Sequence, residues 1–414
     1  MLNYFIRNHF RRLIDNPLMV SYLIWLIPRV GVVFLSYFNV LPIALSQEYI
    51  FGDHGSTSFN YPGYILLSKL VHMLTLNNYI TYVLMHSAVA SLGGICVYRL
   101  STLLGYRSWL KWMSVIGVGF MPYYFSATLF QPQFSVAFMV TTWWIVEVYH
   151  WFLEPLSKKR AIWATIASII AYLFRPYFIG LFVLAIGCIF RLVYKKVKLR
   201  QAFINTGYVV IIFICFFLLM EGVKQYFDIL MPKHILGKNL VLGNNPYIPK
   251  HAQKHDISTW LEDFDYTLII PNVKDISLEE QNQMYINYVI KFIMENPLQV
   301  LKNMGWKAYR FLHWRLDDAD KESMFKNLLY TLPYTCYIPL GILGILRLLH
   351  LNNRDEKLML YFILFVFYGL HIILLHGGIR HRMYMEALPI IFSVYGAYWI
   401  ISKIKLNVSI YKNK

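Results

Sequence analysis

The chain has 414 residues, of which 57% are hydrophobic and only 15% are charged. Soluble domains carry about 25% charged residues, whereas apolar runs of about 20 residues, the length that spans a bilayer, recur along this chain. The composition therefore excludes a soluble enzyme and predicts an integral membrane protein. The formal charge is +17, and in a membrane protein the meaning of such a charge depends on which loops carry it.

Hydropathy and apolar periodicity predict an all-α polytopic membrane protein with about ten transmembrane helices. In chain order the expected spans cover 18–40, 65–99, 109–126, 132–153, 161–174, 176–191, 203–222, 327–347, 358–376 and 383–402. The second stretch is too long for one span, so we expect a surface helix at 62–74 that leads into a span near 79–99. Arg175-Pro176 separates the fifth and sixth spans, because proline disfavours helical backbone in the residue before it.

Basic clusters occupy alternate loops of this arrangement. They are Arg7/Arg11/Arg12, Arg99/Arg107/Lys111, Lys158/Lys159/Arg160, Arg191/Lys195/Lys196/Lys198/Arg200, Arg347/Arg354/Lys357 and Lys403/Lys405/Lys413. All of them fall on one side if both termini are cytoplasmic, as the positive-inside rule favours. The positive charge then reflects topology, and we expect no nucleic-acid partner.

The predicted spans divide the chain into three regions. Residues 1–222 form an N-terminal transmembrane region, residues 223–326 an extracytoplasmic insertion, and residues 327–414 the C-terminal transmembrane helices. The insertion holds most of the Asp and Glu residues. Its segment 278–312 has helical apolar spacing with a break at Asn296-Pro297, which predicts two amphipathic helices at the membrane surface.

Acidic residues of the first outer loop, at about 41–61, are candidates for catalysis. Glu48 and Asp53 are its acids, and a carboxylate at the membrane edge is a suitable general base for an acceptor hydroxyl. An ordinary solvated loop acid is the alternative for each. Tyr61 follows them and begins a Tyr-Pro-Gly-Tyr turn into the surface helix.

Basic residues of the outer face predict an anion site. Arg175 lies in an apolar stretch, where arginine is costly and usually has a partner. Arg380, His381 and Arg382 stand at the mouth of the last span. Arginine forks match phosphate bidentately, so we expect phosphate binding here, with interfacial anchoring as the alternative.

Three further polar residues are candidate substrate-binding residues. Arg29 lies inside the first span, where it either pairs with a buried polar group or contacts a ligand. Asn244 and Asn245 belong to a Gly-Asn-Asn-Pro-Tyr stretch whose composition also fits a simple turn. The sequence has no Walker A, G-x-G-x-x-G or H-E-x-x-H motif. No cofactor is evident and no metal-ligand spacing is recognisable, although a divalent metal is left open.

This ordered set resembles the membrane-embedded GT-C glycosyltransferases, in particular the bacterial branch similar to protein O-mannosyltransferases and the lipid A aminoarabinose transferase. The resemblance covers nearly the whole chain. Its elements are Arg29, Glu48 and Asp53, Tyr61–Tyr64, Arg175-Pro176, Gly243–Tyr247, Glu295–Pro297, and an R-x-R-x-x-x-E-x-x-P motif at Arg380, Arg382, Glu386 and Pro389.

The resemblance implies a fold and a reaction. The fold would be a GT-C-type bundle in a bacterial inner membrane, and the donor a sugar on a polyprenyl phosphate. Glu48 or Asp53 would activate an acceptor at the extracytoplasmic face. Arg175 and the Arg380–Arg382 triplet would hold the donor phosphate as its charge grows. Direct displacement would invert the stereochemistry.

Two departures from the family pattern affect the choice of base. Relatives often have Asp at or before the position of Glu48, where this chain has Gln47-Glu48, and many carry an acid after the third span, where this chain has Gln131-Pro132. The choice between Glu48 and Asp53 therefore stays open, and a divergent or inactive member is compatible with the sequence.

Two other functions remain as alternatives. A surface-polysaccharide polymerase or ligase also uses polyprenyl-linked glycans and outer-face arginines. A transporter or flippase of lipid-linked sugars would need charges near the bilayer midplane and broken helices in paired halves. Arg29 and Glu147 are candidates for such charges, with Glu147 expected nearer the inner interface, but no paired halves are evident. The sugar, the carrier length and the acceptor (lipid A, a glycan or a protein) are not specified.

Overall fold

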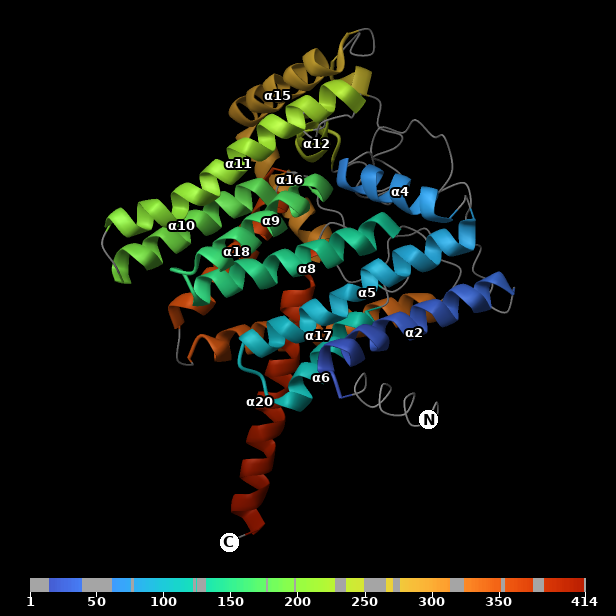
Figure 1. Cartoon of the computed structure of the whole chain (residues 1–414), viewed down its shortest axis with the longest axis vertical. Coiled ribbons are helices and arrows are strands. Elements are labelled where there is room, and N and C mark those ends of the chain that lie inside the picture. Colours follow the sequence, from blue (N-terminus) through green and yellow to red (C-terminus); the bar gives the residue numbers. More distant parts are fainter. Residues whose placement is uncertain are drawn as a thin grey trace, which may run out of the picture.

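The computed structural model describes residues 15–38, 62–75, 78–121, 124, 132–175, 178–196, 199–227, 236–248, 266–270, 276–312, 324–350, 354–374 and 383–412. All regular structure within these residues is helical, with no strand. The predicted all-α class is therefore confirmed. Figure 1 shows α2, α5, α8, α9, α10 and α11 stacked side by side, with α20 running across them.

Four helices in the described part of the chain are long and apolar enough to cross a membrane. They are α2 (Pro17–Tyr37), α5 (Tyr79–Leu103), α8 (Pro132–Leu153) and the first part of α20 (Ala387–Lys412). Shorter apolar stretches lie in α10 (Phe178–Lys196), α11 (Leu199–Phe227), α17 (Met324–Leu348) and α18 (Arg354–Ile373). These helices support membrane association, and the total of about ten spans remains a prediction.

The boundaries predicted from proline and from span length are confirmed. Helix α4 (Pro62–Thr75) is separate from α5, as expected for a surface helix that precedes a span. Helix α9 (Lys158–Phe174) ends directly before Arg175, whose extended backbone (φ −153°, ψ 109°) is the conformation that a following proline favours. Helix α15 (Leu278–Glu295) ends at the predicted Asn296-Pro297 break, and α16 (Pro297–Leu312) follows.

Trp25 anchors α2 to its neighbours through a slot lined by glycines. A Cβ atom on Gly93 of α5, or on Gly119 of α6 (Ser108–Gly119), would collide with the Trp25 ring, and one on Gly94 of α5 would collide with the Ser21 carbonyl. The indole Nε1 donates to the Val115 carbonyl at 2.8 Å. Because the ring occupies the space that side chains would fill, α2 is held in one register, which fixes the height of Arg29 one turn further on.

Helices α17 and α20 pack backbone against backbone. A Cβ atom on Gly344 would collide with the Phe392 carbonyl, and one on Gly396 with the Leu340 carbonyl. Such close approach through small residues is a common way to associate helices in a membrane. The start of α20 is therefore fixed against α17.

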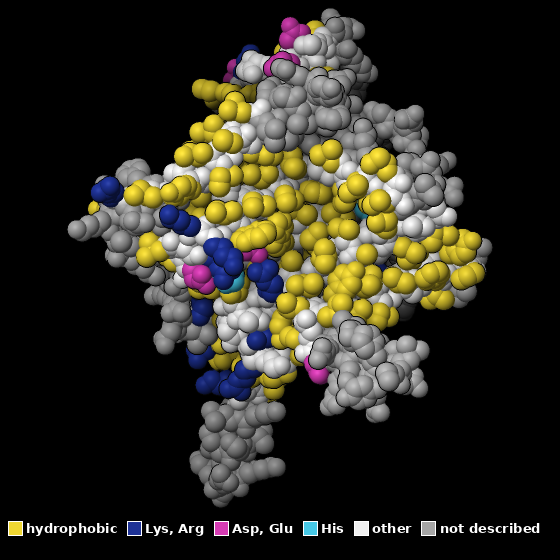
Figure 2. Space-filling model, viewed as in Figure 1, with side chains coloured by type: hydrophobic (Ala, Val, Ile, Leu, Met, Phe, Trp, Pro, Cys, Tyr) yellow, Lys and Arg dark blue, Asp and Glu magenta, His cyan; other side chains and the backbone are white. Residues whose placement is uncertain are grey.

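The bundle has two chemically different ends. At the first, the Arg107 guanidinium lies over the Tyr398 ring, Arg347 over Trp399, and Lys111 over Tyr98. We call this the basic end. Figure 2 shows Lys and Arg side chains gathered at one side of a broad apolar surface.

The opposite end, here called the site end, is where α9 and α18 finish and where α8 and α20 begin. At this end Asn244, which follows α12 (Leu236–Gly243), and Lys307 of α16 bond the carbonyls at the end of α18, and α15 lies near the top of Figure 1.

Helix α16 has its polar side turned toward the protein. Asn303 and Lys307 are buried, whereas Leu298, Leu301 and Tyr309 are exposed. This distribution is the reverse of that on a helix that faces water. The predicted amphipathic character is thus present, with the apolar side outward.

Candidate functional site

The structure describes four of the ten candidate site residues. Glu48, Asp53, Tyr61, Arg380, His381 and Arg382 lie outside the described residues, and their roles stay predictions. Arg29, Arg175, Asn244 and Asn245 are described, and each is buried.

Arg175 occupies a cage of aromatic side chains at the site end. Its guanidinium donates to the Tyr384 hydroxyl and lies over the rings of Phe134, at 5.2 Å, and Tyr384, at 4.6 Å. The residue is only 5% exposed. A planar guanidinium stacked on aromatic faces keeps its charge and its fork geometry in apolar surroundings, so the site end contains a fixed positive group.

The partner of Arg175 lies directly after the predicted Arg380–Arg382 triplet in the chain. Tyr384 belongs to the short helix η4 (Met383–Met385), and its carbonyl accepts from the Thr141 hydroxyl at 2.8 Å. Phe134 and Tyr384 also stack, with ring centroids 6.2 Å apart. The structure therefore brings Arg175 into contact with η4, which begins one residue after Arg382. A phosphate site shared by Arg175 and the triplet would require such a contact.

Arg29 is held by backbone carbonyls and aromatic rings. Its Nη1 donates to the Trp25 carbonyl at 2.9 Å and its Nη2 to the Gly119 carbonyl at 3.3 Å. The guanidinium lies over the rings of Trp25 and Tyr124, at 5.2 and 4.9 Å. These contacts cap the end of α6 and join α2 to α6. Of the two roles expected for Arg29, they therefore favour pairing with buried polar groups over contact with a ligand.

Asn244 and Asn245 use their amides to connect backbone segments. Asn244 Nδ2 donates to the Leu240 carbonyl at 2.9 Å and to the Leu374 carbonyl, at the end of α18, at 2.7 Å. Asn245 Nδ2 donates to the Val241 carbonyl at 2.9 Å. These bonds give both residues an architectural role, and substrate binding by them stays a prediction.

Lys307 joins the same connection and was not a candidate from the sequence. Its Nζ donates to the Ile373 carbonyl at 2.9 Å and reaches Asn244 Oδ1 at 3.5 Å. Lys307 and Asn244 thus cap two successive carbonyls at the end of α18, a region where carbonyls lack partners within the helix. Burial lowers the pKa of Lys307 from its ordinary 10.5 to about 7. The sequence pattern of an amphipathic helix predicts that its lysines are exposed. The burial of Lys307 is seen only in the structure, where α16 turns its polar side toward the protein.

Glu386, the acid of the R-x-R-x-x-x-E-x-x-P motif, is buried between α17 and α20. Its carboxylate accepts from the hydroxyls of Tyr334, at 3.4 Å, and Tyr337, at 3.2 Å. The acid therefore fixes the start of α20, from which η4 and Tyr384 are positioned.

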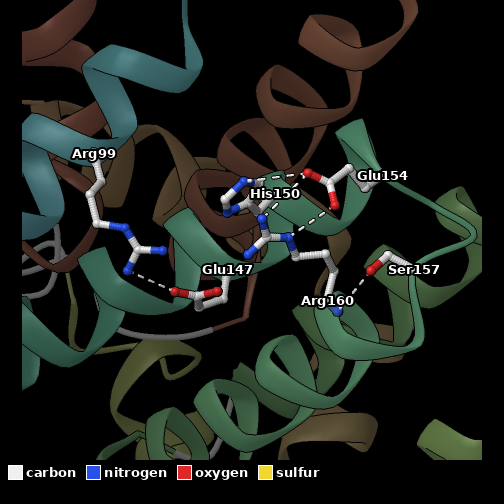
Figure 3. Close-up of polar contacts among 6 residues, drawn as sticks. All are labelled: Arg99, Glu147, His150, Glu154, Ser157 and Arg160. Atoms are coloured by element: carbon white, nitrogen blue, oxygen red, sulfur yellow. Dashed lines mark hydrogen bonds and ion pairs between the residues drawn. The ribbon is translucent and has the colours of Figure 1, made fainter.

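Glu147 lies in the second half of α8, toward the basic end, and its expected place near the inner interface stays a prediction. Its Oε1 pairs with Arg99 Nη1 of α5 at 3.0 Å, and Trp143 Nε1 donates to the same oxygen at 3.2 Å. Figure 3 shows the pair beside a second one, in which Arg160 Nε contacts Glu154 Oε2 at 3.1 Å. The acid is therefore paired with a permanent cation.

Among the described residues, no group of three or more His, Cys, Asp or Glu side chains is arranged to hold a metal ion. No protein-family model matches the chain, and no curated protein matches it significantly. The resemblance to GT-C glycosyltransferases therefore rests on the ordered sequence motifs alone.

Proposed function

We propose that the chain is a glycosyltransferase of the bacterial inner membrane that moves a sugar from a polyprenyl phosphate to an acceptor at the extracytoplasmic face. The basic end would face the cytoplasm, with both termini there, because cytoplasmic loops carry an excess of Lys and Arg. The site end would then open at the extracytoplasmic face.

The observation that carries the proposal is the buried Arg175 held against Tyr384. The guanidinium is a permanent charge in low-dielectric surroundings, where its interaction with a growing negative charge is stronger than in water. Its aromatic cage fixes the orientation of the guanidinium fork. The chain supplies two more arginines immediately before η4, so the same place would hold several phosphate-binding forks.

The reaction would be a direct displacement at the anomeric carbon. Glu48 or Asp53 takes the proton of the acceptor hydroxyl, and the acceptor oxygen forms a bond to the anomeric carbon. The bond from that carbon to the phosphate oxygen breaks, and its electron pair leaves with polyprenyl phosphate. The arginines stabilise the charge gained by this leaving group.

Binding of a short polyprenyl phosphate to the purified protein in nanodiscs tests the proposal. Native mass spectrometry would compare wild type with the double variant Arg380→Ala/Arg382→Ala, and with Lys158→Ala/Lys159→Ala, a pair of exposed cations at the other end of α9, as control. We expect binding that the first variant loses and the second keeps. Absent binding, or equal binding by all three, would contradict the proposed function.

A further inference from the structure

His86 is a buried imidazole at the site end that the proposed reaction does not use. It lies in the third turn of α5, is 0% exposed, and stacks on Tyr82 with ring centroids 4.2 Å apart. Its Nδ1 lies 3.0 Å from the Tyr82 carbonyl oxygen. Because a carbonyl only accepts hydrogen bonds, Nδ1 carries the proton, and Nε2 of the neutral ring has a lone pair.

That lone pair has no hydrogen-bond partner within the described part of the chain. His86 Nε2 is buried and unbonded, and the same holds for the hydroxyl of the next residue, Ser87. A buried polar atom without a partner is destabilising, because it has lost its hydrogen bonds to water, so each such atom calls for an explanation. One explanation is that His86 Nε2 accepts a hydrogen bond from a ligand.

The surroundings of His86 connect it to the candidate site. The Tyr82 hydroxyl lies 3.1 Å from the Tyr64 hydroxyl of α4. A Cβ atom on Gly63, which precedes Tyr64, would lie 2.9 Å from the ring of Phe174. Phe174 is the residue before Arg175, so α4 packs both on α5, which carries His86, and on the end of α9, which carries Arg175.

We propose that His86 Nε2 is a hydroxyl-binding group for the sugar of the donor, next to the phosphate held by Arg175. The inference rests on the proposed function. A lone pair repels phosphate oxygens and accepts from O–H, so a sugar hydroxyl fits it and an anion does not. The arginine and the histidine would thus recognise different parts of one glycolipid.

Three substitutions separate this role from a structural one. Asn at position 86 retains a donor near Nδ1, and can keep the bond to the Tyr82 carbonyl, but has nothing at Nε2. Gln places its amide oxygen near Nε2, and Phe retains only the ring shape. The matched control is His350→Asn, because His350 makes the same kind of bond, 2.8 Å to the Leu346 carbonyl, but is exposed and lies after α17 at the basic end.

The measurement is the affinity for short polyprenyl phosphates carrying glucose, mannose or arabinose, relative to the sugar-free polyprenyl phosphate. We expect His86→Asn and His86→Phe to lose about three- to tenfold of the preference for a sugar-bearing lipid, the value of one hydrogen bond. His86→Gln should retain most of it, and His350→Asn all of it. Sugar-free polyprenyl phosphate should bind equally well to every variant.

Each other outcome overturns the inference. Equal preference in all three variants means that His86 meets only a buried water or the core, although the proposed function stands. If His86→Asn is thermally more stable than His86→Gln, and both keep the wild-type preference for a sugar-bearing lipid, His86 has a structural role alone. If the wild type binds neither kind of lipid, the proposed function fails and the hydroxyl site fails with it.

Discussion

The Arg175 guanidinium donates to the hydroxyl of Tyr384, a residue 209 positions further along the chain. The bond joins the end of α9 to η4, and Glu386, two residues later, is anchored by tyrosines of α17. The cation at the end of α9 thus contacts η4 through Tyr384 and α8 through Phe134, and α17 supports η4 indirectly through Glu386. An ordinary surface arginine has no such support, and these contacts favour a positioned functional group.

Substitution of Arg175 and Tyr384 tests the phosphate role of this contact. Arg175→Lys should lower the affinity for a short polyprenyl phosphate at least about tenfold, because lysine cannot form the planar fork. Tyr384→Phe keeps the stacking and loses one charge-assisted bond, so we expect a smaller loss, about three- to tenfold. Native mass spectrometry measures both. Tyr208→Phe is the control, since Tyr208 is exposed and lies near Lys158 of the basic end. Unchanged affinity in Arg175→Lys would remove Arg175 from the site.

The two acids of the first outer loop should differ in their effect on turnover. If one is the general base, its amide variant, Glu48→Gln or Asp53→Asn, should lower the transfer rate about 10²–10⁴-fold and leave donor affinity unchanged. The other variant should transfer at a near-normal rate. Radiolabelled sugar transfer in nanodiscs, with donor affinity measured in parallel, distinguishes them. Normal transfer by both variants would show that neither carboxylate is the base.

The sequence predicted the helix boundaries better than the roles of single polar residues. Arg175-Pro176 and Asn296-Pro297 mark real helix ends, because proline constrains the residue before it whatever the tertiary context. The surface helix before α5 followed from span length alone. These features depend on local chemistry, so one sequence is enough to reveal them.

Roles that depend on contacts between distant segments were not visible in the sequence. Asn244 and Asn245 looked like turn residues or ligands. The chain does turn here, with Asn245 Oδ1 accepting from the Tyr247 N–H, and the side-chain amides also bond backbone carbonyls, which the sequence did not show. Lys307 and His86 were missed because burial decides their chemistry, and periodicity does not report which face of α16 or α5 meets the protein. Arg29 was correctly placed inside the first long apolar helix, but the sequence did not show that its guanidinium bonds carbonyls of α2 itself and of α6.

Close packing of α17 on α20 predicts a sharp difference between two glycines. Gly344→Ala should destabilise the protein by about 1–3 kcal/mol, the usual effect of overpacking, because the new methyl group would meet the Phe392 carbonyl. Gly369→Ala in α18 has open space around it and should be neutral or stabilising by up to about 1 kcal/mol. Thermal unfolding in detergent compares the two. Equal midpoints would contradict the observed helix packing.

Lys307 predicts a dependence of stability on pH. Its pKa is lowered by burial to about 7 in the folded protein, from 10.5, so between these values the unfolded chain binds more protons than the folded chain. Stability therefore rises with pH across this window, by at most about 1.4 kcal/mol per pH unit from this group. Below pH 7 the lysine is charged in both states and its contribution is constant.

Thermal midpoints at pH 7 and pH 9 measure this effect. The rise should be larger in wild type than in Lys307→Met, in which the titrating group is absent. Lys302→Met is the matched control, because Lys302 is exposed on the same helix and its loss should leave the wild-type rise unchanged. The same rise in all three proteins would show that Lys307 is not buried in solution.

Glu147 distinguishes the transferase from a proton-coupled transporter. Its carboxylate is 5% exposed and is paired with Arg99, whose side chain is 34% exposed. A paired acid of this kind has a structural role in a transferase. Breaking a fully buried pair costs about 3–5 kcal/mol, and the exposure of Arg99 reduces this figure, so we expect Glu147→Gln to lose about 1–2 kcal/mol. Sugar transfer per folded molecule should not change, because the pair lies at the end of α8 remote from Phe134 and Arg175. The contrary outcome would identify a transporter. If Glu147→Gln keeps its stability and abolishes movement of a lipid-linked sugar across the membrane of proteoliposomes, the acid carries a coupling proton and the chain is a transporter.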